Sequence, residues 1–525
     1  MRRIVALLAV IALAACTRGG HRGAANVLRI ADDADPTSLN PLLAHDQDTI
    51  GYDLLVTQTL IGLSTGNRLT PELVTRVPSR ANGDVSPDGK RIVYHLRPDV
   101  RFADGVAFTS RDVAFTYRAI VDPRNPVETQ AAYRVIASLA TPDAHTVVIR
   151  LHRPWNAAVA ELFAQADFAF GILPAHAFSS TDMTHADWNQ HPFGTGPFRV
   201  VEWERGNRIV LARNPYFRPR PHLDGVTFEL IPSTASSLTA LRSGDVDVVE
   251  VLPNQLPDAR DIPGTRLMTT PVNGEYVLIV QTQAAPTRNL NVRRAIAAAL
   301  DPREMVRGRE EAMSPADSFL PPVFAWHVDA MRGRFDDSAI VARSLQAAGY
   351  RRTGPWWTRD GEPLAVTLIY QTGRGDWLPT IEQEQLRRAG IDAGLKSFVP
   401  AQFNAPGGPL RSGRFQLADS AWIGAADPEQ SVIFACSQQG SNGNNNSAYC
   451  NPRFDVRFED QAVTASVTRR AEDFRAMQRM VANDLPVIPI AFMSDVDVVA
   501  ARVHGFRRNM LMYPADAAFW SVSTP

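Results

Sequence analysis

The stretch LAVTLIYQTGRGDWLPTIEQEQLRRAGIDAGLKSF, from Leu364 to Phe398, decides the fold class. Residues 364–370 form an apolar, β-branched run that predicts a strand. Residues 380–389 predict a helix that ends at Gly390, and residues 391–398 predict a second strand. A strand, a helix and a strand in this order form a βαβ unit, so a parallel sheet is expected in the C-terminal half.

The rest of the chain also alternates between strand patterns and helix patterns. Residues 92–96 alternate as a half-buried strand, and Thr109 with Asp112 three positions later predicts a capping box that opens a helix through Ile120. Residues 338–348 predict a helix with Gly349 just past its end, and a Trp-rich hairpin follows, turning at residues 360–361. These patterns predict an α/β protein.

Length and composition limit the possibilities. The chain has 525 residues, of which 45% are hydrophobic and 21% are charged, so two or three domains are expected. A formal net charge of −1 gives no sign of a nucleic-acid surface.

The N-terminus predicts export. A basic start precedes the apolar run from Ile4 to Ala15, which would rise only ~18 Å as a helix and is too short to span ~30 Å of hydrocarbon. Residues 1–15 therefore suit a signal peptide. Residues 13–16 resemble the lipobox of bacterial lipoproteins, in which Cys16 would be diacylated, with residues 16–26 as a tether. The alternative is an ordinary cleaved signal with an incidental cysteine.

Two further cysteines, Cys436 and Cys450, remain in an exported chain and suggest a disulfide. Such a link across a short loop would contribute ~3 kcal/mol in the chain-entropy model. Two buried free thiols remain an alternative, and a metal pair is disfavoured because no histidine lies nearby.

Catalytic motifs give little support for an enzyme. Residues 62–66 match G-x-S-x-G around Ser64, but turn sequence follows where a nucleophile elbow needs a helix. Asp32, Asp33 and Asp35 lack the spacing of a calcium loop, so a solvated acidic turn is expected. No dinucleotide, P-loop or metalloprotease motif is found, and neither a cofactor nor a metal is expected.

An ordered series of motifs runs from about Asn26 to the C-terminus. The series comprises S-L-N-P at 38–41, L-R-P-D-V-R-F-A-D-G at 96–105 with D-V at 112–113, G-T-G-P-F at 194–198, R-N-P-Y-F at 213–217, G-D-V-D at 244–247, V-R-R-A at 292–295 with L-D-P-R at 300–303, A-G-Y at 348–350, A-G-I at 389–391 and Trp422 with D-P at 427–428. In this series the chain resembles the extracellular solute-binding proteins that include dipeptide- and oligopeptide-binding proteins of ABC importers.

The resemblance implies a two-lobed periplasmic-binding-protein-like fold. Its first lobe would be discontinuous, an additional insert domain would follow the first segment, and short strands would join the lobes. The boundaries implied are 27–65, 190–270 and 490–525 for the first lobe, 66–189 for the insert domain and 271–489 for the second lobe.

The resemblance also implies where a ligand binds. An extended peptide would pair with a strand edge at Ala421, Trp422 and Ile423. The opposing loop would be His45, Asp46 and Gln47, and the cleft-side segment Asn445, Asn446 and Ser447 would be braced by the disulfide. Trp422 could instead belong to the core, His45 could face solvent, and residues 445–447 could be only a flexible loop.

One departure from the family concerns charge. Peptide-binding relatives place an aspartate three residues after this tryptophan, where it neutralises the peptide ammonium; here Ala425 stands there. Either Asp427 or Asp419 substitutes, or the ligand has no free amino terminus, or that end stays solvated. A second departure is Val127 after Asn-Pro, where dipeptide binders tend to carry a tyrosine.

The sequence thus predicts a lipid-anchored, monomeric binding protein that carries a peptide or peptide-like solute to ABC permease subunits. Within the same fold, a sugar-containing ligand, an opine-like molecule or a metal chelate stays open. The alternatives from other classes are an envelope lipoprotein that uses the fold for scaffolding and, last, a Ser64 hydrolase.

Overall fold

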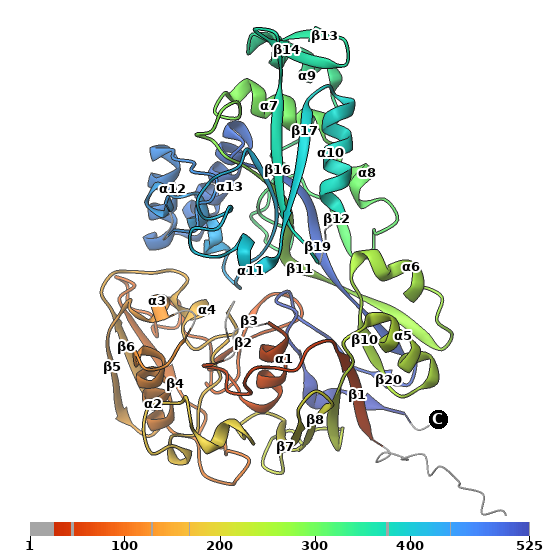
Figure 1. Cartoon of the computed structure of the whole chain (residues 1–525). Helices are drawn as coiled ribbons and strands as arrows, with labels where there is room; N and C mark the ends of the chain where they lie inside the picture. The colour runs from red at the N-terminus through yellow and green to blue at the C-terminus, as the bar shows by residue number, and fades with distance from the viewer. Residues whose placement is uncertain are drawn as a thin grey trace, which may run out of the picture.

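A computed structural model of the protein describes residues 26–43, 47–127, 130–166, 169–373, 377–440 and 443–523. The chain forms two lobes and an insert domain beside the first lobe (Figure 1). Within the described ranges an 11-stranded mixed sheet passes through both lobes, in the order β17-β16-β18-β11-β19-β10-β1-β9-β8-β7, with β12 beside β19. The two-lobed α/β fold expected from the sequence is confirmed.

Two long strands, β11 (Thr265–Val280) and β19 (Val487–Ala500), cross between the lobes as an antiparallel pair. Residues 272–280 of β11 are all buried. A continuous buried run is typical of a strand covered on both faces. The boundaries expected at 270/271 and 489/490 therefore fall inside these two strands.

The first lobe holds one end of the large sheet. Its strand β1 pairs in parallel with both β9 and β10. The elements are β1 (Val27–Asp32), α1 (Gln47–Val56), β2 (Ile61–Leu63), β7 (Phe198–Glu204), β8 (Arg208–Arg213), β9 (Gly225–Leu230), α5 (Thr234–Ser243), β10 (Val248–Glu250), α6 (Leu256–Ala259), β20 (Val503–His504) and β21 (Ser521–Val522). Strand β3 (Leu69–Pro71), which pairs with β2, falls just beyond the expected boundary, in the insert domain.

The G-T-G-P turn holds α1 in place. A Cβ atom on Gly194 would lie 2.4 Å from the Val56 carbonyl oxygen, and one on Gly196 would lie 2.6 Å from that of Leu55. Real side chains do not approach a backbone so closely, so glycine allows this turn to pack directly on the last turn of α1.

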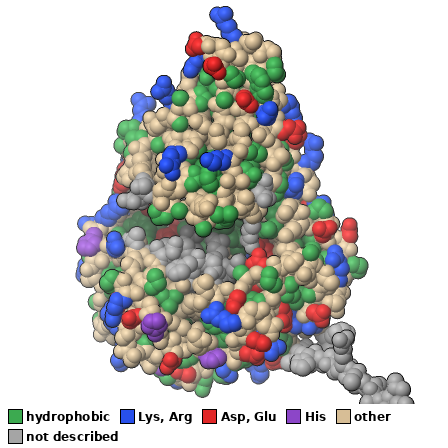
Figure 2. Space-filling view, in the orientation of Figure 1, with side chains coloured by type: hydrophobic (Ala, Val, Ile, Leu, Met, Phe, Trp, Pro, Cys, Tyr) green, Lys and Arg blue, Asp and Glu red, His purple; other side chains and the backbone are tan. Residues whose placement is uncertain are grey.

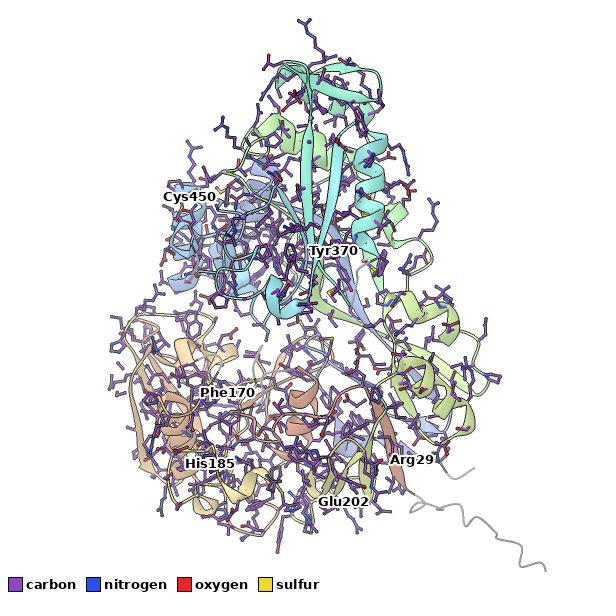
Figure 3. The ribbon with its side chains drawn as sticks, viewed as in Figure 1. Arg29, Phe170, His185, Glu202, Tyr370 and Cys450 are labelled. Atoms are coloured by element: carbon purple, nitrogen blue, oxygen red, sulfur yellow. A yellow bond between two sulfur atoms is a disulfide. The ribbon has the colours of Figure 1, made fainter. Side chains whose placement is uncertain are left out.

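The insert domain has its own small sheet, in the order β4-β6-β5, and its core also includes Leu42, Leu60 and Ile61 of the first-lobe segment. Thr109 and Asp112 form the expected capping box at the start of α2. Figure 3 shows Phe170 and His185 in this domain, apart from Arg29 and Glu202 in the first lobe. The elements are β4 (Arg91–His95), α2 (Ser110–Val121), α3 (Gln130–Tyr133), β5 (Ile136–Asp143), β6 (Thr146–Leu151) and α4 (Ala158–Glu161).

The second lobe contains the predicted βαβ unit. Strands β16 and β17 pair in parallel from Ala365–Asp392 to Gln371–Phe398, which confirms the parallel sheet. The elements are α7 (Leu290–Ala299), α8 (Pro302–Val306), β12 (Met313–Pro315), α9 (Ser338–Ala347), β13 (Arg351–Thr353), β14 (Trp356–Arg359), β15 (Glu362–Pro363), β16 (Ala365–Gln371), α10 (Leu378–Arg388), β17 (Asp392–Phe398), α11 (Pro400–Phe403), β18 (Leu417–Ile423), α12 (Pro452–Val463) and α13 (Val467–Asp484).

Further local predictions are confirmed in this lobe. Gly349 follows α9 with φ +86°, a conformation that favours glycine, and the hairpin of β14 and β15 turns at Asp360-Gly361. Cys436 and Cys450 form the expected disulfide. No helix among the described residues is long and apolar enough to cross a membrane.

Candidate functional site

A cavity of about 440 Å³ lies where the two lobes meet. This volume is in the range of sites that enclose small ligands. Its walls come from β1, α1, α5, β10 and the C-terminal segment of the first lobe, from the ends of β16 and β18 in the second lobe, and from the two crossing strands. Figure 2 shows the surface hollowed across the middle of the molecule, between the second lobe and the parts below it.

Strand β18 presents an open edge at this cavity. Its parallel ladder with β16 joins Leu368 to Leu417 and Ile369 to Ala418, whereas its ladder with β11 continues to Ile423. Strand β16 goes on pairing with β17, so it separates from β18 beyond Ala418. Among the described residues no strand pairs with residues 420–423 on that side, which leaves their backbone groups for an added strand.

The three predicted residues of this edge face opposite ways, as strand geometry requires. Ala421 and Ile423 line the cavity. The ring of Trp422 points to the other face and meets that of Phe434 edge to face, at 5.9 Å between centroids. The tryptophan side chain therefore packs against the core, while its backbone belongs to the open edge.

The predicted opposing loop lies largely outside what the structure describes. His45 and Asp46 are not among the described residues, and Gln47 begins α1 without a described side chain. Further along the same helix, Gly51, Tyr52 and Leu55 line the cavity.

The predicted segment 445–447 does not line the cavity, and Asn445 and Ser447 within it are buried. The Asn445 side chain donates to the carbonyls of Ala435 and Tyr449, at 3.0 and 2.7 Å, and accepts from the Ser447 hydroxyl. The Ser447 carbonyl accepts from the backbone and hydroxyl of Thr282, just after β11. For Asn446, the carbonyl accepts from Gln281. These contacts fasten the disulfide-bridged loop to the second lobe.

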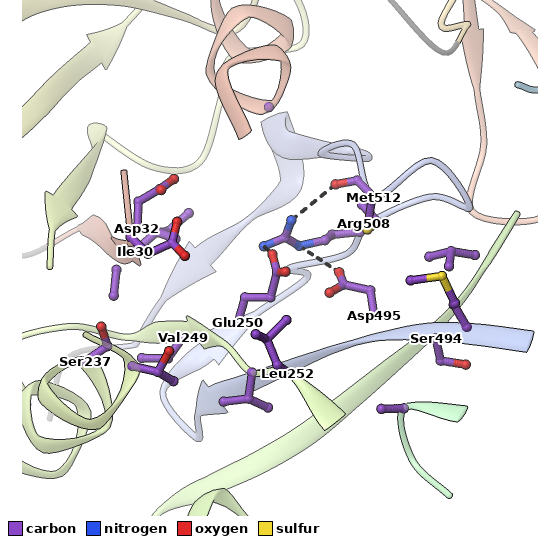
Figure 4. Close-up of a pocket in the computed structure, with 18 of the residues that line it drawn as sticks. Ile30, Asp32, Ser237, Val249, Glu250, Leu252, Ser494, Asp495, Arg508 and Met512 are labelled. Carbon is purple, nitrogen blue, oxygen red and sulfur yellow. Dashed lines mark hydrogen bonds and ion pairs between the residues drawn. The ribbon is translucent and has the colours of Figure 1, made fainter. Parts of the chain in front are cut away.

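A charged cluster around Arg508 forms part of the first-lobe wall (Figure 4). The guanidinium donates to both carboxylate oxygens of Asp497, at 3.1 and 3.0 Å, and to the Met512 carbonyl at 3.2 Å. It also lies 3.2 Å from an Asp495 oxygen and 3.4 Å from a Glu250 oxygen. One cation thus faces three carboxylates.

Burial shifts the pKa of the two aspartates in this cluster. It raises the pKa of Asp497 to about 6, partly offset by Arg508. Burial also raises the pKa of Asp495 well above its ordinary value; Arg508 opposes this, whereas Glu250 and Asp497 add to it. Asp495 therefore holds a proton more tightly than an exposed aspartate does.

Asp32, at the end of β1, also lines the cavity. It accepts hydrogen bonds from the Tyr52 hydroxyl and the Ala34 backbone, yet burial raises its pKa overall. The sequence predicted a solvated acidic turn here. The structure corrects this for Asp32 because α1 covers the end of the strand, whereas Asp33 is exposed.

Neither candidate substitute for the missing carboxylate lines the cavity. The Asp427 carboxylate is held by Arg470 through two bonds, of 2.8 and 2.6 Å. Asp419 is buried beside Glu382 of α10, and burial raises the pKa of both carboxyl groups well above their ordinary values. The second lobe therefore offers no carboxylate among the described lining residues.

The insert domain also contacts the second lobe, at the rim of the cleft. The backbone of Asn156 donates to the Ala462 carbonyl at 2.8 Å, and its side chain donates to the Gln461 and Thr464 carbonyls, at 2.7 and 2.8 Å. The Trp155 indole donates to Glu429. We call these contacts the Asn156 latch.

Burial in this latch raises the pKa of Glu429 to about 7, and the nearby Asp427 adds to the shift. Trp155 and Arg470 act in the opposite direction. The contact joins residues more than 270 positions apart in the chain, so it depends on how the insert domain and the second lobe are placed.

A bulge in β11 lies where the lobes join. The ladder to β19 is interrupted between Pro271 and Glu275. Within the bulge, the Asn273 backbone donates to the Met510 carbonyl at 2.9 Å, and its side chain donates to the Ala425 carbonyl at 2.7 Å. Asn273 thus ties the C-terminal segment of the first lobe to the loop that follows β18.

Other candidate sites do not assemble. Ser64 lies in the turn of the β2–β3 hairpin, where its hydroxyl accepts from the Arg68 backbone at 3.2 Å. Across the described ranges no group of three His, Cys, Asp or Glu side chains could hold a metal ion.

Four charged residues of the cavity wall were not predicted from the sequence, namely Asp32, Glu250, Asp495 and Arg508. They come from four separate segments, and only the acidic run at Asp32 gave any signal.

Comparison with known proteins agrees with this architecture. The chain is 26% identical over 498 residues to Protein XP55 of Streptomyces lividans, covering 94% of this chain and 88% of that protein. It is 22% identical over 539 residues to the oligopeptide-binding protein OppA of Bacillus subtilis, covering 95% of each.

Solved structures share the fold. The ABC transporter substrate-binding protein CtaP of Listeria monocytogenes superposes with a TM-score of 0.82 at 22% identity, over 95% of this chain and 99% of that one. AppA of Bacillus subtilis, in complex with a nonapeptide, gives 0.75 at 20% identity, over 94% and 98%. NikA of Brucella suis, in complex with Fe(III)-EDTA, gives 0.83 at 20% identity, over 94% and 99%.

A family model supplies the assignment. The model of the bacterial extracellular solute-binding proteins, family 5, matches residues 68–444. These relatives are binding proteins, which confirms the expectation that the chain is not an enzyme. Because the matched segment is more than half of the chain, this protein belongs to the bacterial extracellular solute-binding proteins of family 5.

Proposed function

We propose that this protein captures a peptide or peptide-like solute between its two lobes and delivers it to the membrane subunits of an ABC importer. The observation that carries the proposal is the cavity of about 440 Å³, lined from both lobes and bordered by the open edge of β18. A ligand that touches both lobes stabilises the closed arrangement by its contacts with each of them.

An extended peptide suits this site because its backbone can extend the sheet. The backbone groups of Ala421, Trp422 and Ile423 would pair with it, and its side chains would enter the cavity beside Ala421 and Ile423. Residues 45–47 would face the ligand from the first lobe. Residues 445–447 would act indirectly, by holding the loop that the disulfide closes.

We also propose the domain division 27–65, 190–270 and 490–525 for the first lobe, 66–189 for the insert domain and 271–489 for the second lobe. The separate sheet of β4, β6 and β5 supports an insert domain between the first two segments of the first lobe. Residues 1–15 would be removed on export, and a lipid on Cys16 would keep the monomeric protein at the membrane, near its transporter. Cys16 lies outside the described residues, so this part rests on the sequence.

Native mass spectrometry of gently purified protein tests capture. We expect a small molecule that co-purifies in a one-to-one complex and is lost on denaturation. The variant Ala421→Trp, which fills the cavity, should purify empty. Ala365→Trp, at an exposed position on β16, should retain the molecule and serves as the control.

Two outcomes would contradict the proposal. If the wild type is empty in every preparation and binds no peptide from a mixed library, the scaffolding alternative is favoured. If Ala421→Trp keeps the molecule as well as the wild type, the ligand does not occupy this cavity.

A further inference from the structure

The charge of the cavity wall restricts the class of ligand. Among the described lining residues, four are acidic, namely Asp32, Asp33, Glu250 and Asp495, and Arg508 is the one cation. A closed cavity has a low dielectric constant, so such an excess of one sign acts strongly on whatever enters.

Arg508 cannot serve as a partner for an acidic ligand. Its three nitrogen atoms already contact Asp497, the Met512 carbonyl, Asp495 and Glu250, at 3.0 to 3.4 Å. Its charge is more than balanced by these carboxylates. The cluster therefore remains negative overall, with acceptor capacity left over.

Asp495 carries the hydrogen-bond acceptor that remains unfilled among the described residues of this cluster. Its side chain is 2% exposed and belongs to the cavity wall. The Nε–H of Arg508 is directed to Asp497, so the Asp495 oxygen 3.2 Å away accepts no hydrogen bond from any described residue. A buried acceptor without a donor is unfavourable, and a donor on the ligand would remove that cost.

We propose that the ligand carries an ammonium or guanidinium group, and that Asp495 and Glu250, together with Asp32 on the same wall, hold this group against the first lobe. The inference rests on the proposed function, since it names the substrate class of that site. The second lobe, with Ala425 in place of the family aspartate and with Asp427 held by Arg470, supplies no competing carboxylate among the residues described.

The same wall disfavours anionic cargo. A negatively charged chelate, such as the one bound by the Brucella suis relative, would meet Asp495 and Glu250 without a free cation among the described lining residues. Like charges enclosed together repel each other, so the cavity disfavours anionic ligands as well as favouring cationic ones.

Binding should release a proton. Burial raises the pKa of Asp495 and a bound cation would lower it, so binding should release a proton over the pH range between these two values. The charged groups facing Asp495 are Arg508, Glu250 and Asp497. Affinity for a cation should therefore rise with pH, until the pH at which Asp495 is already ionised in the protein without ligand.

Isothermal titration with four tripeptides tests the inference. The probes are tri-alanine, its N-acetylated form, and two N-acetylated peptides with a central lysine or glutamate. We expect the lysine peptide or free-amine tri-alanine to bind at least tenfold more tightly than the acetylated alanine peptide, and the glutamate peptide to bind most weakly. If the lysine peptide binds more tightly than free-amine tri-alanine, the site recognises a side-chain cation; the reverse order indicates an α-ammonium.

The variant Asp495→Asn should lose this discrimination, with at least a tenfold drop for the cationic probe and little change for acetylated tri-alanine. Proton release, measured in buffers of different ionisation enthalpy, should vanish with it. Asp360→Asn removes one charge at a position 94% exposed and should change neither quantity. Glu250→Gln, whose side chain is 29% exposed, provides a second variant should Asp495→Asn fold poorly.

The outcomes separate this inference from the function on which it rests. Equal or tighter binding of the neutral or acidic probe overturns the inference and leaves solute capture intact. Unchanged discrimination in Asp495→Asn and Glu250→Gln overturns the assignment to this wall. Binding of none of the four probes by an empty protein contradicts both proposals.

Discussion

Glu382 and Asp419 form a buried pair of carboxyl groups in the second lobe, next to the strand that carries the open edge. Glu382 is fully buried, and neither of its oxygens accepts a hydrogen bond from the described residues. Burial raises the pKa of Glu382 well above its ordinary value, and the nearby Asp419 adds to the shift. The folded protein thus holds this proton more tightly than the unfolded chain does.

Folded stability should therefore fall as pH rises above the unfolded value near 4.3, because the unfolded chain gives up the proton more easily. Glu382→Gln should raise the free energy of unfolding by about 1 to 3 kcal/mol at pH 8, and by less at pH 5. Urea unfolding at the two pH values measures this. Glu384→Gln, 70% exposed on the same helix, should change stability little at either pH. Equal destabilisation by Glu382→Gln at both pH values would contradict the account.

Ala425 tests which lobe neutralises the ligand. Ala425→Asp restores the carboxylate that peptide-binding relatives carry, but Ala425 is not part of the cavity wall, and its carbonyl is held by Asn273. We expect less than a twofold change in affinity for free-amine tri-alanine, measured by titration calorimetry. A tenfold gain that disappears with the N-acetylated peptide would place the ammonium in the second lobe.

Among the elements, the Asn156 latch connects binding to lobe arrangement. Asn156→Ala removes two side-chain hydrogen bonds to α12 and the residue just beyond it without touching the cavity. At a net ~0.5 to 1.5 kcal/mol each, their loss should weaken the closed state by about 1 to 3 kcal/mol. Ligand affinity should fall by about fivefold to about 160-fold, mainly through faster dissociation in stopped-flow measurements.

A control for the latch comes from the first lobe. Asn207→Ala removes an exposed asparagine in the β7–β8 hairpin, where its side chain bonds only locally, to Glu204, and affinity should not change. An Asn156→Ala protein with wild-type affinity and dissociation rate would show that the latch plays no part in ligand retention.

Elements with a strong local pattern could be predicted from the sequence. The parallel pairing of β16 with β17, the capping box at Thr109 and the glycine after α9 all depend on residues close together in the chain. The lengths of β11 and β19 could not be predicted, because their pairing joins segments more than 200 residues apart and is interrupted by a bulge.

The candidate site was predictable only in part. The edge at 421–423 came from a resemblance, and strand alternation explains why Trp422 turns away from the cavity while its neighbours face it. The cluster of Asp32, Glu250, Asp495 and Arg508 has no local signature. Long-range strand order brings these residues together, and burial then sets their charge.

At the scale of the whole molecule, the account requires two lobes that can separate and close on a solute. Strands β11 and β19 connect them, the bulge at 272–274 interrupts the ladder between those strands, and the Asn156 latch joins the insert domain to the second lobe. A ligand that contacts both lobes should shift the population toward the closed form.

Small-angle X-ray scattering measures that shift most directly. The protein, stripped of ligand by unfolding and refolding, is compared with the same sample saturated by the tightest-binding tripeptide. We expect the radius of gyration to decrease on saturation, and Ala421→Trp to show no decrease with peptide. An unchanged radius of gyration in the wild type, at a peptide concentration that calorimetry shows to be saturating, would contradict capture by closure.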